Sequence, residues 1–259
     1  MFKRIILSLV FVGINAFAGK FVKIAVIDTG IDEEYSKHIP HCSSPDKDFS
    51  GTGIKDTHGH GTHIASIIAS KQGREGYCLL IIKFWNPAAA GVINGKNLID
   101  SINYAVDMKV DVINLSVEGD EFQQEEFKAI TRALKKGIKI FVAAGNSNRN
   151  IDDEPSFPAS YPPVGKNKIT IVGSKSSIQY FRIPNQSTIQ RYNFRTKKYD
   201  TIPIGKHAWS NYGARVNQWE DGKQVLGAGL NGKQAFMSGT SQATAIATGK
   251  YVRALLDQK

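Results

Sequence analysis

Three histidines lie close together in the stretch DTHGHGTHIAS, residues 56 to 66. They are His58, His60 and His63, and glycines stand between them. Imidazoles at this spacing could bind a metal, form a pH-sensitive loop or supply a general base. A metal site needs a third and usually a fourth ligand, which no neighbouring residue clearly provides. A base needs a nucleophile, and a carboxylate to orient it, elsewhere in the chain.

The chain contains a candidate for each of these two partners. Asp28 ends the apolar run FVKIAVID, and Ser241 lies in Gly239-Thr240-Ser241, where a helical stretch of small residues begins. A carboxylate that orients an imidazole, which in turn takes the proton of a hydroxyl group, is the chemistry of a nucleophilic serine. Most aspartates in the position of Asp28 are only N-caps or turn formers, so Asp28 alone decides nothing.

The elements that must position these residues alternate along the chain. Short β-branched runs are expected to be strands, and longer amphipathic patterns to be helices. The expected strands are 21–28, 79–85, 110–116, 138–145 and 168–174, and the expected helices are 60–70, 97–109 and 125–137. This alternation predicts an α/β domain with a parallel sheet covered on both faces. Working residues lie beyond the carboxyl ends of such strands, which selects Asp28, Ser116 and Asn146.

Four segments, taken in order, resemble the subtilisin-like serine proteases, the subtilase family (peptidase S8). They are VIDTGID around Asp28, HGTH from His60, AAGN ending at Asn146 and GTSQA containing Ser241. DVINLS and the SNYG at 210–213 extend the likeness over nearly all of the mature chain. The resemblance implies a three-layer α/β fold, in which helices flank a mainly parallel sheet.

The resemblance also implies a role for each candidate residue. Asp28, His60 and Ser241 would form the catalytic triad of a serine endopeptidase. Asn146 would donate a hydrogen bond to the oxyanion, and its alternative is a simple turn residue. No metal ligand is implied. An extended substrate would be bound by Gly91, Ser116, Val117, Glu118 and Gly119.

Three of these positions need a further remark. Glu118 stands where subtilases of broad specificity commonly have glycine. A carboxylate at the rim of the primary pocket would favour Lys or Arg before the scissile bond, and a solvated surface glutamate is the alternative. His63 follows His60 by one helical turn and is expected to be inward-facing support, whereas His58 is expected to be a loop residue.

The chain departs from the family pattern in several places. The link KQGREGYC is too short to hold the loop that binds calcium in many subtilases, so no cofactor is expected and calcium is not predicted. Only a few residues precede Asp28 in the mature chain, so the usual pro-segment is expected to be missing. Residues 175–208, with SIQYFRI and TIQRYNF around PNQS, are expected to form an inserted β-hairpin.

The first eighteen residues, MFKRIILSLVFVGINAFA, have the pattern of a secretory signal peptide. Two basic residues precede a short apolar run, and a small-x-small motif ends at Ala18. The run is short of the roughly 20 residues that span a bilayer, so cleavage is favoured over an anchor. The peptidase domain would then be residues 19–259, secreted or periplasmic. In that setting Cys42 and Cys78 either form a disulfide or remain free thiols, and the sequence leaves both open.

The composition bounds the remaining function classes. The formal net charge is +10, but the basic residues are scattered and no nucleic-acid module is recognisable, so no nucleic-acid partner is expected. We expect a monomer without stable membrane association that acts on proteins or peptides. One rival is a catalytically silent subtilase-like domain that binds peptides. The other is an ester hydrolase of the α/β type, whose G-x-S-x-G elbow is absent around Ser241.

Overall fold

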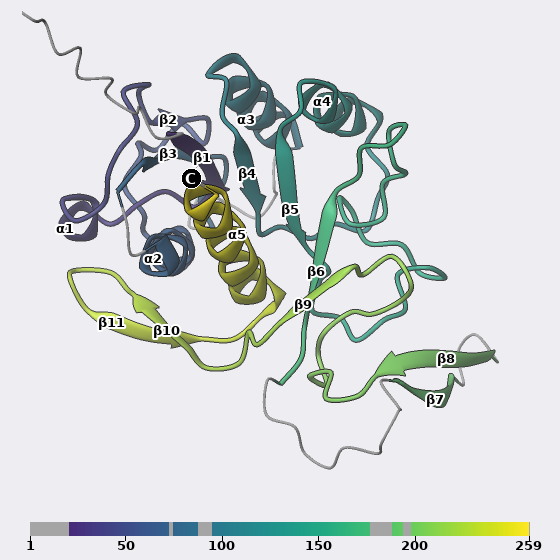
Figure 1. Cartoon of the computed structure of the whole chain (residues 1–259). Helices are drawn as coiled ribbons and strands as arrows, with labels where there is room; N and C mark the ends of the chain where they lie inside the picture. The colour runs from purple at the N-terminus through teal and green to yellow at the C-terminus, as the bar shows by residue number, and fades with distance from the viewer. Residues whose placement is uncertain (1–20, 73–74, 88–94, 177–187, 194–197, 259) are drawn as a thin grey trace, which may run out of the picture.

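The structure is a computed structural model that describes residues 21–72, 75–87, 95–176, 188–193 and 198–258 (Figure 1). The predicted signal peptide and Gly91 lie outside these residues. Among the described residues, seven strands form one sheet in the order β2-β3-β1-β4-β5-β6-β9, and every neighbouring pair is parallel. The strands are β1 Val22–Asp28, β2 Lys47–Asp48, β3 Tyr77–Lys83, β4 Val112–Leu115, β5 Lys139–Ala143, β6 Thr170–Ser174 and β9 Gln218–Glu220.

Helices cover both faces of this sheet and make a three-layer structure (Figure 1). On one face lie α2 (His60–Gln72) and α5 (Thr240–Asp257), and on the other α3 (Gly95–Asp107) and α4 (Gln124–Lys135). Alternate residues of β1 serve the two cores: Ile24 packs toward α2 and α5, whereas Ile27 packs toward α3 and α4. The predicted α/β fold with a mainly parallel sheet flanked by helices is therefore confirmed.

The shortest elements cannot be predicted from the periodicity of apolar residues. The four-residue helix α1 (Glu33–Ser36), β2 and β9 contain no continuous apolar run. A hairpin of β10 (Val225–Ala228) and β11 (Gln234–Met237) lies outside the main sheet. It contacts α2, where the His63 ring and the Ser66 hydroxyl group meet its backbone.

A second antiparallel pair lies within the stretch expected to contain an inserted hairpin. Strand β7 (Thr188–Asn193) pairs with β8 (Lys198–Pro203). Half of the expected motif, TIQRYN, is thus a strand, and its partner is KYDTIP. The other expected half, SIQYFRI, lies outside the described residues.

The two cysteines form a disulfide bond. Cys42 precedes β2 and Cys78 is the second residue of β3, and their Cα atoms are 4.9 Å apart. Of the two alternatives left open by the sequence, the structure has the disulfide. No helix within the described residues has the length and apolar character needed to cross a membrane.

A buried carboxylate, that of Asp56, joins the end of β1 to the start of α2. Its Oδ1 accepts hydrogen bonds from the Thr29 hydroxyl group at 3.0 Å and from the backbone N–H groups of His58 and Gly59 at 2.9 and 2.8 Å. Its Oδ2 accepts from the backbone and the hydroxyl group of Thr62 at 2.9 and 2.7 Å. Asp56 therefore satisfies donors before α2 and in its first turn, besides the donor after β1.

These donors also set the pKa of Asp56. Burial alone would raise the pKa of this carboxyl group, but the hydrogen bonds from Gly59, Thr62 and His58 lower it below the ordinary value. The folded state therefore prefers the ionised form. The resulting stability is present above the unfolded pKa of 3.8 and is lost as the pH falls through the lower folded pKa.

We expect Asp56→Asn to lower the free energy of unfolding at pH 7 by about 2 to 3 kcal/mol, because an amide group cannot accept all five bonds. The deficit should shrink at pH 3, because the carboxyl group of the unfolded wild type, with its ordinary pKa of 3.8, takes up a proton there and the folded state's preference for the ionised form contributes less. Denaturant titrations at both pH values measure this difference. Asp107→Asn, which alters an exposed ion pair with Arg132, is the control and should change little. Equal deficits of Asp56→Asn at both pH values would contradict the assigned role.

Candidate active site

The carboxylate of Asp28 and the imidazole of His60 are in direct contact. Asp28 is the last residue of β1 and is 3% exposed, and His60 is the first residue of α2. His60 Nδ1 lies 2.7 Å from Asp28 Oδ1, which also accepts the Thr29 backbone N–H at 2.8 Å. An ionised carboxylate can accept hydrogen bonds but cannot donate them. The proton in this contact therefore lies on Nδ1, and Nε2 is the basic nitrogen of a neutral ring.

The surroundings of His60 make its ring more basic than usual. Burial lowers the pKa of His60, but the charge and hydrogen bond of Asp28 raise it more, and Asp56 adds to the increase, so that the pKa lies above its ordinary value. The side chain remains 22% exposed. A proton taken up at Nε2 is therefore stabilised at a position that a bound molecule can reach.

Close packing of backbone brings β1 and α2 within reach of each other. A Cβ atom on Gly61 would lie 2.5 Å from the Gly30 carbonyl oxygen, so only glycine fits at Gly61. Gly30 itself has a φ of 104°. The Gly61 N–H also donates to the Thr29 hydroxyl group at 2.9 Å. The glycine beside His60 thus permits the approach of strand and helix that the Asp28–His60 contact requires.

Ser241 is the second residue of α5 and is 8% exposed. A chain of buried and partly buried hydrogen bonds supports the first turn of α5. The Thr248 hydroxyl group donates to Asn114 Oδ1 at 2.9 Å, Asn114 Nδ2 donates to Ser116 Oγ at 3.0 Å, and Ser116 Oγ donates to the Ser241 carbonyl oxygen at 3.4 Å. Ser116 therefore ties the end of β4 to the first turn of α5, and Asn114 and Thr248 are support that the sequence patterns did not indicate.

The side-chain amide of Asn146 has a defined orientation. The backbone N–H and the hydroxyl group of Thr240 both donate to its Oδ1, at 2.9 and 3.1 Å. Because a backbone N–H is only a donor, the atom that faces it must be the amide oxygen. The Nδ2 group then points away from Thr240, and among the described residues none accepts a hydrogen bond from it.

One cavity of about 230 Å³ brings these groups together. Asp28, His60, Ser116, Asn146 and Ser241 all line it, as predicted from their places after strands or at helix starts. Among the described residues, no hydrogen bond joins His60 to Ser241. Such contacts are often long in proteins without a bound substrate. The other residues that line the cavity are His58, Phe84, Trp85, Val117, Glu118 and Ala143.

His58 lies in the loop before α2, as expected, and it also lines this cavity. The ring centroids of His58 and Trp85 are 5.9 Å apart, and those of His58 and His60 are 6.2 Å apart. The first glycine of the stretch, Gly59, turns the backbone with a φ of 94° just before α2. Because of this turn, the sequence HGH places two imidazoles side by side.

Glu118 also lines the cavity, but its carboxylate is already bound by other groups. Oε2 accepts the Asn146 backbone N–H at 2.9 Å. Oε1 lies near the donors of Ser147 and Asn211, both at 3.1 Å, and of Arg149 and Ser156, both at 3.4 Å. The side chain is 23% exposed, which is intermediate between a solvated and a buried carboxylate. The predicted preference for Lys or Arg stays a prediction, and the nearby Arg149 weighs against it by offsetting the charge.

The remaining residues predicted to bind substrate differ in their surroundings. Val117 lines the cavity, and among the described residues its backbone N–H and C=O groups have no partner. Gly119 instead exchanges two backbone hydrogen bonds of 2.8 Å with Phe157. Gly119 cannot offer those groups to a substrate strand while this bridge exists.

His63 is fully buried and faces away from the cavity of His60, in agreement with inward-facing support. Its Nε2 lies 3.1 Å from the Val225 carbonyl oxygen and 3.2 Å from that of Ala235. Both partners are acceptors, so Nε2 carries the proton. Burial lowers the pKa of His63 more than these bonds raise it. His63 is thus a neutral anchor for the β10–β11 hairpin.

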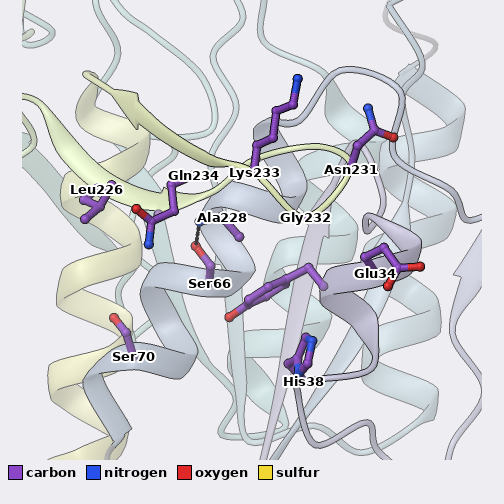
Figure 2. Close-up of a pocket in the computed structure, with 13 residues that line it drawn as sticks. Glu34, His38, Ser66, Ser70, Leu226, Ala228, Asn231, Gly232, Lys233 and Gln234 are labelled. Atoms are coloured by element: carbon purple, nitrogen blue, oxygen red, sulfur yellow. Dashed lines mark hydrogen bonds between the residues drawn. The ribbon is translucent and has the colours of Figure 1, made fainter.

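A larger cavity, of about 610 Å³, lies between α1, α2 and the β10–β11 hairpin (Figure 2). Figure 2 shows the Ser66 hydroxyl group bonded to the Ala228 backbone, with Glu34, His38 and Lys233 around the opening. None of its residues lines the cavity of His60 and Ser241. Its size does not make it the reactive site, because it lacks the hydrogen-bonded carboxylate and imidazole pair.

Comparison with known proteins agrees with this geometry. The chain is 31% identical to the "Intracellular serine protease" of Paenibacillus polymyxa over 246 residues, which are 89% of this chain and 65% of that protein. It is 34% identical to the "Major intracellular serine protease" of Bacillus subtilis (strain 168) over 179 residues, 61% of this chain and 52% of the relative. The chain thus spans between half and two thirds of the length of these relatives.

A solved structure and a family model also relate the chain to subtilisin-like proteins. A cold adapted subtilisin-like serine proteinase superposes with a TM-score of 0.67 at 23% identity, covering 94% of this chain and 78% of that structure, which shows the fold. The family model described as the subtilase family matches residues 19–258. This match spans nearly the whole chain, and the chain therefore belongs to the subtilase family.

Proposed function

We propose that this protein is a serine endopeptidase that hydrolyses peptide bonds in protein or peptide substrates. The observation that carries the proposal is the 2.7 Å contact between Asp28 and His60 beside a cavity that Ser241 and Asn146 also line. Membership of the subtilase family supports it, as do relatives named serine proteases. The residues proposed to form the peptidase domain are 19–259.

In the proposed mechanism, Ser241 Oγ attacks the carbonyl carbon of the scissile bond while His60 Nε2 takes its proton. Asp28 keeps the proton of His60 on Nδ1 and stabilises the imidazolium that forms. His60 then gives the proton to the leaving amine, and a water molecule, activated in the same way, hydrolyses the acyl-enzyme. The support for this sequence is that Asp28 is buried and hydrogen-bonded while the His60 ring remains partly exposed.

The tetrahedral intermediate places a negative charge on the former carbonyl oxygen. We propose Asn146 Nδ2 as one donor to it, because both Thr240 donors hold the amide oxygen on the opposite side. The first turn of α5 adds N–H groups without helical acceptors and the positive end of the helix dipole. Donors held in advance in this way stabilise charge only where it develops.

Substrate is proposed to bind as an extended strand along Ser116, Val117 and Glu118. The free backbone groups of Val117 support this, because pairing with a strand edge needs unpaired N–H and C=O groups. Gly119 would contribute surface and not backbone hydrogen bonds, and Gly91 stays a prediction from the resemblance. No nucleic-acid partner or stable membrane association is proposed, and the protein is proposed to act as a monomer without a calcium requirement.

A fluorophosphonate probe tests the proposed nucleophile. We expect it to label the wild type and not Ser241→Ala, and we expect His60→Ala to lose peptidase activity almost as completely, since such residues act as a unit. Ser238→Ala is the matched control, because Ser238 is a nearby exposed serine whose hydroxyl oxygen accepts the Gln224 backbone N–H at 2.8 Å and which does not line the cavity of His60. Equal labelling of wild type and Ser241→Ala would contradict the assignment. Peptide binding with neither labelling nor cleavage would favour the catalytically silent alternative.

The raised pKa of His60 predicts the acid limb of the pH profile. Only the neutral ring can take a proton, so kcat/KM should rise with pH through an apparent pKa above the ordinary 6.5. Asp28→Asn removes the main cause of the increase, so the limb should move to lower pH. The variant should also lose kcat by about ten-thousand-fold, as in other serine-protease triads, because the ring loses its orienting acceptor. An unchanged limb in Asp28→Asn would refute the coupling of the two residues.

We further propose export to a periplasmic or extracellular location, although two relatives are named intracellular. The N-terminal leader pattern and the Cys42–Cys78 disulfide support it, since disulfides persist in oxidising compartments. N-terminal sequencing of the protein made in a bacterial host should find Gly19 as the first residue in the exported fraction, and a thiol assay should find no free cysteine. Full-length protein beginning at Met1 and confined to the cytoplasm would contradict export.

A further inference from the structure

A further cavity, of about 350 Å³, lies directly beside the cavity that holds His60 and Ser241. We call the cavity of His60 and Ser241 the first cavity and this one the second cavity. Val117 and Glu118 line both cavities, so the two cavities share this segment as a border. The second cavity lies where α3 and α4 begin, and these helices are neighbours on one face of the sheet (Figure 1). A substrate strand that runs along Val117 would therefore pass both cavities.

The lining of the second cavity is strongly acidic. Its described residues include no lysine or arginine but four carboxylates, those of Glu118, Asp120, Glu121 and Glu126. Arg149 offsets the first two, at 3.4 Å from Glu118 and 2.6 Å from Asp120. Within the described part of the chain, no cation forms an ion pair with Glu121 or Glu126. Among the described residues, the cavity thus keeps acidic groups that no ion pair balances.

Glu126 is the most unusual of the four. It lies in the first turn of α4 and is only 7% exposed, and its Oε1 atom has no hydrogen-bond partner among the described residues. Burial raises the pKa of Glu126 to about 7, against a smaller lowering by the Tyr161 hydroxyl group. A buried carboxyl group with an unused oxygen is destabilising unless a ligand completes its hydrogen bonds.

The other side of the cavity is apolar. Leu98, Val117 and Phe157 contribute to it, and the Phe157 ring packs against Tyr161 with centroids 4.9 Å apart. A long basic side chain has matching chemistry, because its alkyl stem covers apolar surface while its charged end reaches a carboxylate. A small inorganic cation would leave this apolar wall without a contact.

We infer that this cavity binds a lysine or arginine side chain of the substrate, with Glu126 as the residue that pairs with the cation. The inference rests on the proposed function and concerns a position other than the one next to the scissile bond. Alternate side chains of an extended strand point to the same side. A residue two or more positions from the one that fills the first cavity would therefore reach the second.

Matched fluorogenic peptides test the inference. Sets with Lys, Gln or Leu at each of the second to fifth positions before the scissile bond should show one position where Lys raises kcat/KM by about tenfold or more over Gln. In Glu126→Gln this Lys-over-Gln ratio should fall close to one, because the carboxylate that pairs with the cation is gone. Circular dichroism and thermal melting establish that the variant folds.

Two further variants distinguish a specific pair between Glu126 and the substrate cation from a general attraction by the negative charges around the cavity. Glu125→Gln removes the same charge from the same turn, but Glu125 is exposed, pairs with Lys128 and does not line the cavity, so its Lys preference should persist. Glu121→Gln removes an exposed carboxylate at the cavity and should reduce the preference only in part. If Glu126→Gln does not fold, the Lys-over-Gln ratio of the wild type and the Glu121→Gln result decide the question.

Failure of the inference differs visibly from failure of the proposed function. Cleavage with no preference for Lys, with a preference for Leu, or with a Lys preference that survives Glu126→Gln would overturn the acidic subsite and leave the peptidase intact. If no peptide is cleaved, calorimetric titration of the wild type with the Lys and Gln peptides applies the same test to binding. Tighter binding of the Lys peptide that Glu126→Gln abolishes supports the subsite, and equal binding of both peptides refutes it.

Discussion

The reactive geometry depends first on how Asp56 ties two segments together. The end of β1 carries Asp28 and the start of α2 carries His60, and neither strand nor helix geometry alone sets the distance between them. Asp56 accepts from donors on both segments, and Gly61 lets their backbones meet. The 2.7 Å contact of Asp28 with His60 is then a consequence of this buried attachment and does not rest on two flexible side chains.

A second attachment positions the other half of the site. Asn146 follows β5 and binds Thr240, the residue before Ser241, while Ser116 after β4 reaches the Ser241 carbonyl oxygen. Three neighbouring strand ends thus hold the carboxylate, the loop of Ser116 and the amide around one helix start. Glu118 adds a bond to the Asn146 backbone and connects the two loops that border the cavity. A substitution of a residue that makes one of these hydrogen bonds is expected to displace other groups of the site, including groups that it does not contact.

Much of this arrangement can be predicted from sequence, because it follows from local pattern and topology. The apolar runs that end at Asp28 and near Asn146 identify strands, and the carboxyl ends of parallel strands must meet along one edge. The surroundings of single polar residues cannot be predicted in this way. Asp56 looks like a turn residue in DTHGHGT, and its donors come from separate segments. The pairing of Gly119 with Phe157 and the burial of Glu126 depend on contacts between residues far apart in the chain or on the packing of α4.

The position of Ser241 on α5 has a consequence for the order in which the protein becomes competent. In the chain, Ser241 comes after Asp28, His60, Ser116 and Asn146, and α5 packs against α2 and against β4, β5, β6 and β9. During synthesis, the nascent chain therefore contains Asp28, the proposed base His60 and the proposed oxyanion donor Asn146 long before the proposed nucleophile Ser241 exists. Contacts of such high sequence separation also form late in folding. On the proposed mechanism, the emerging protein would thus be inert toward its own unfolded segments until α5 has been made and docked.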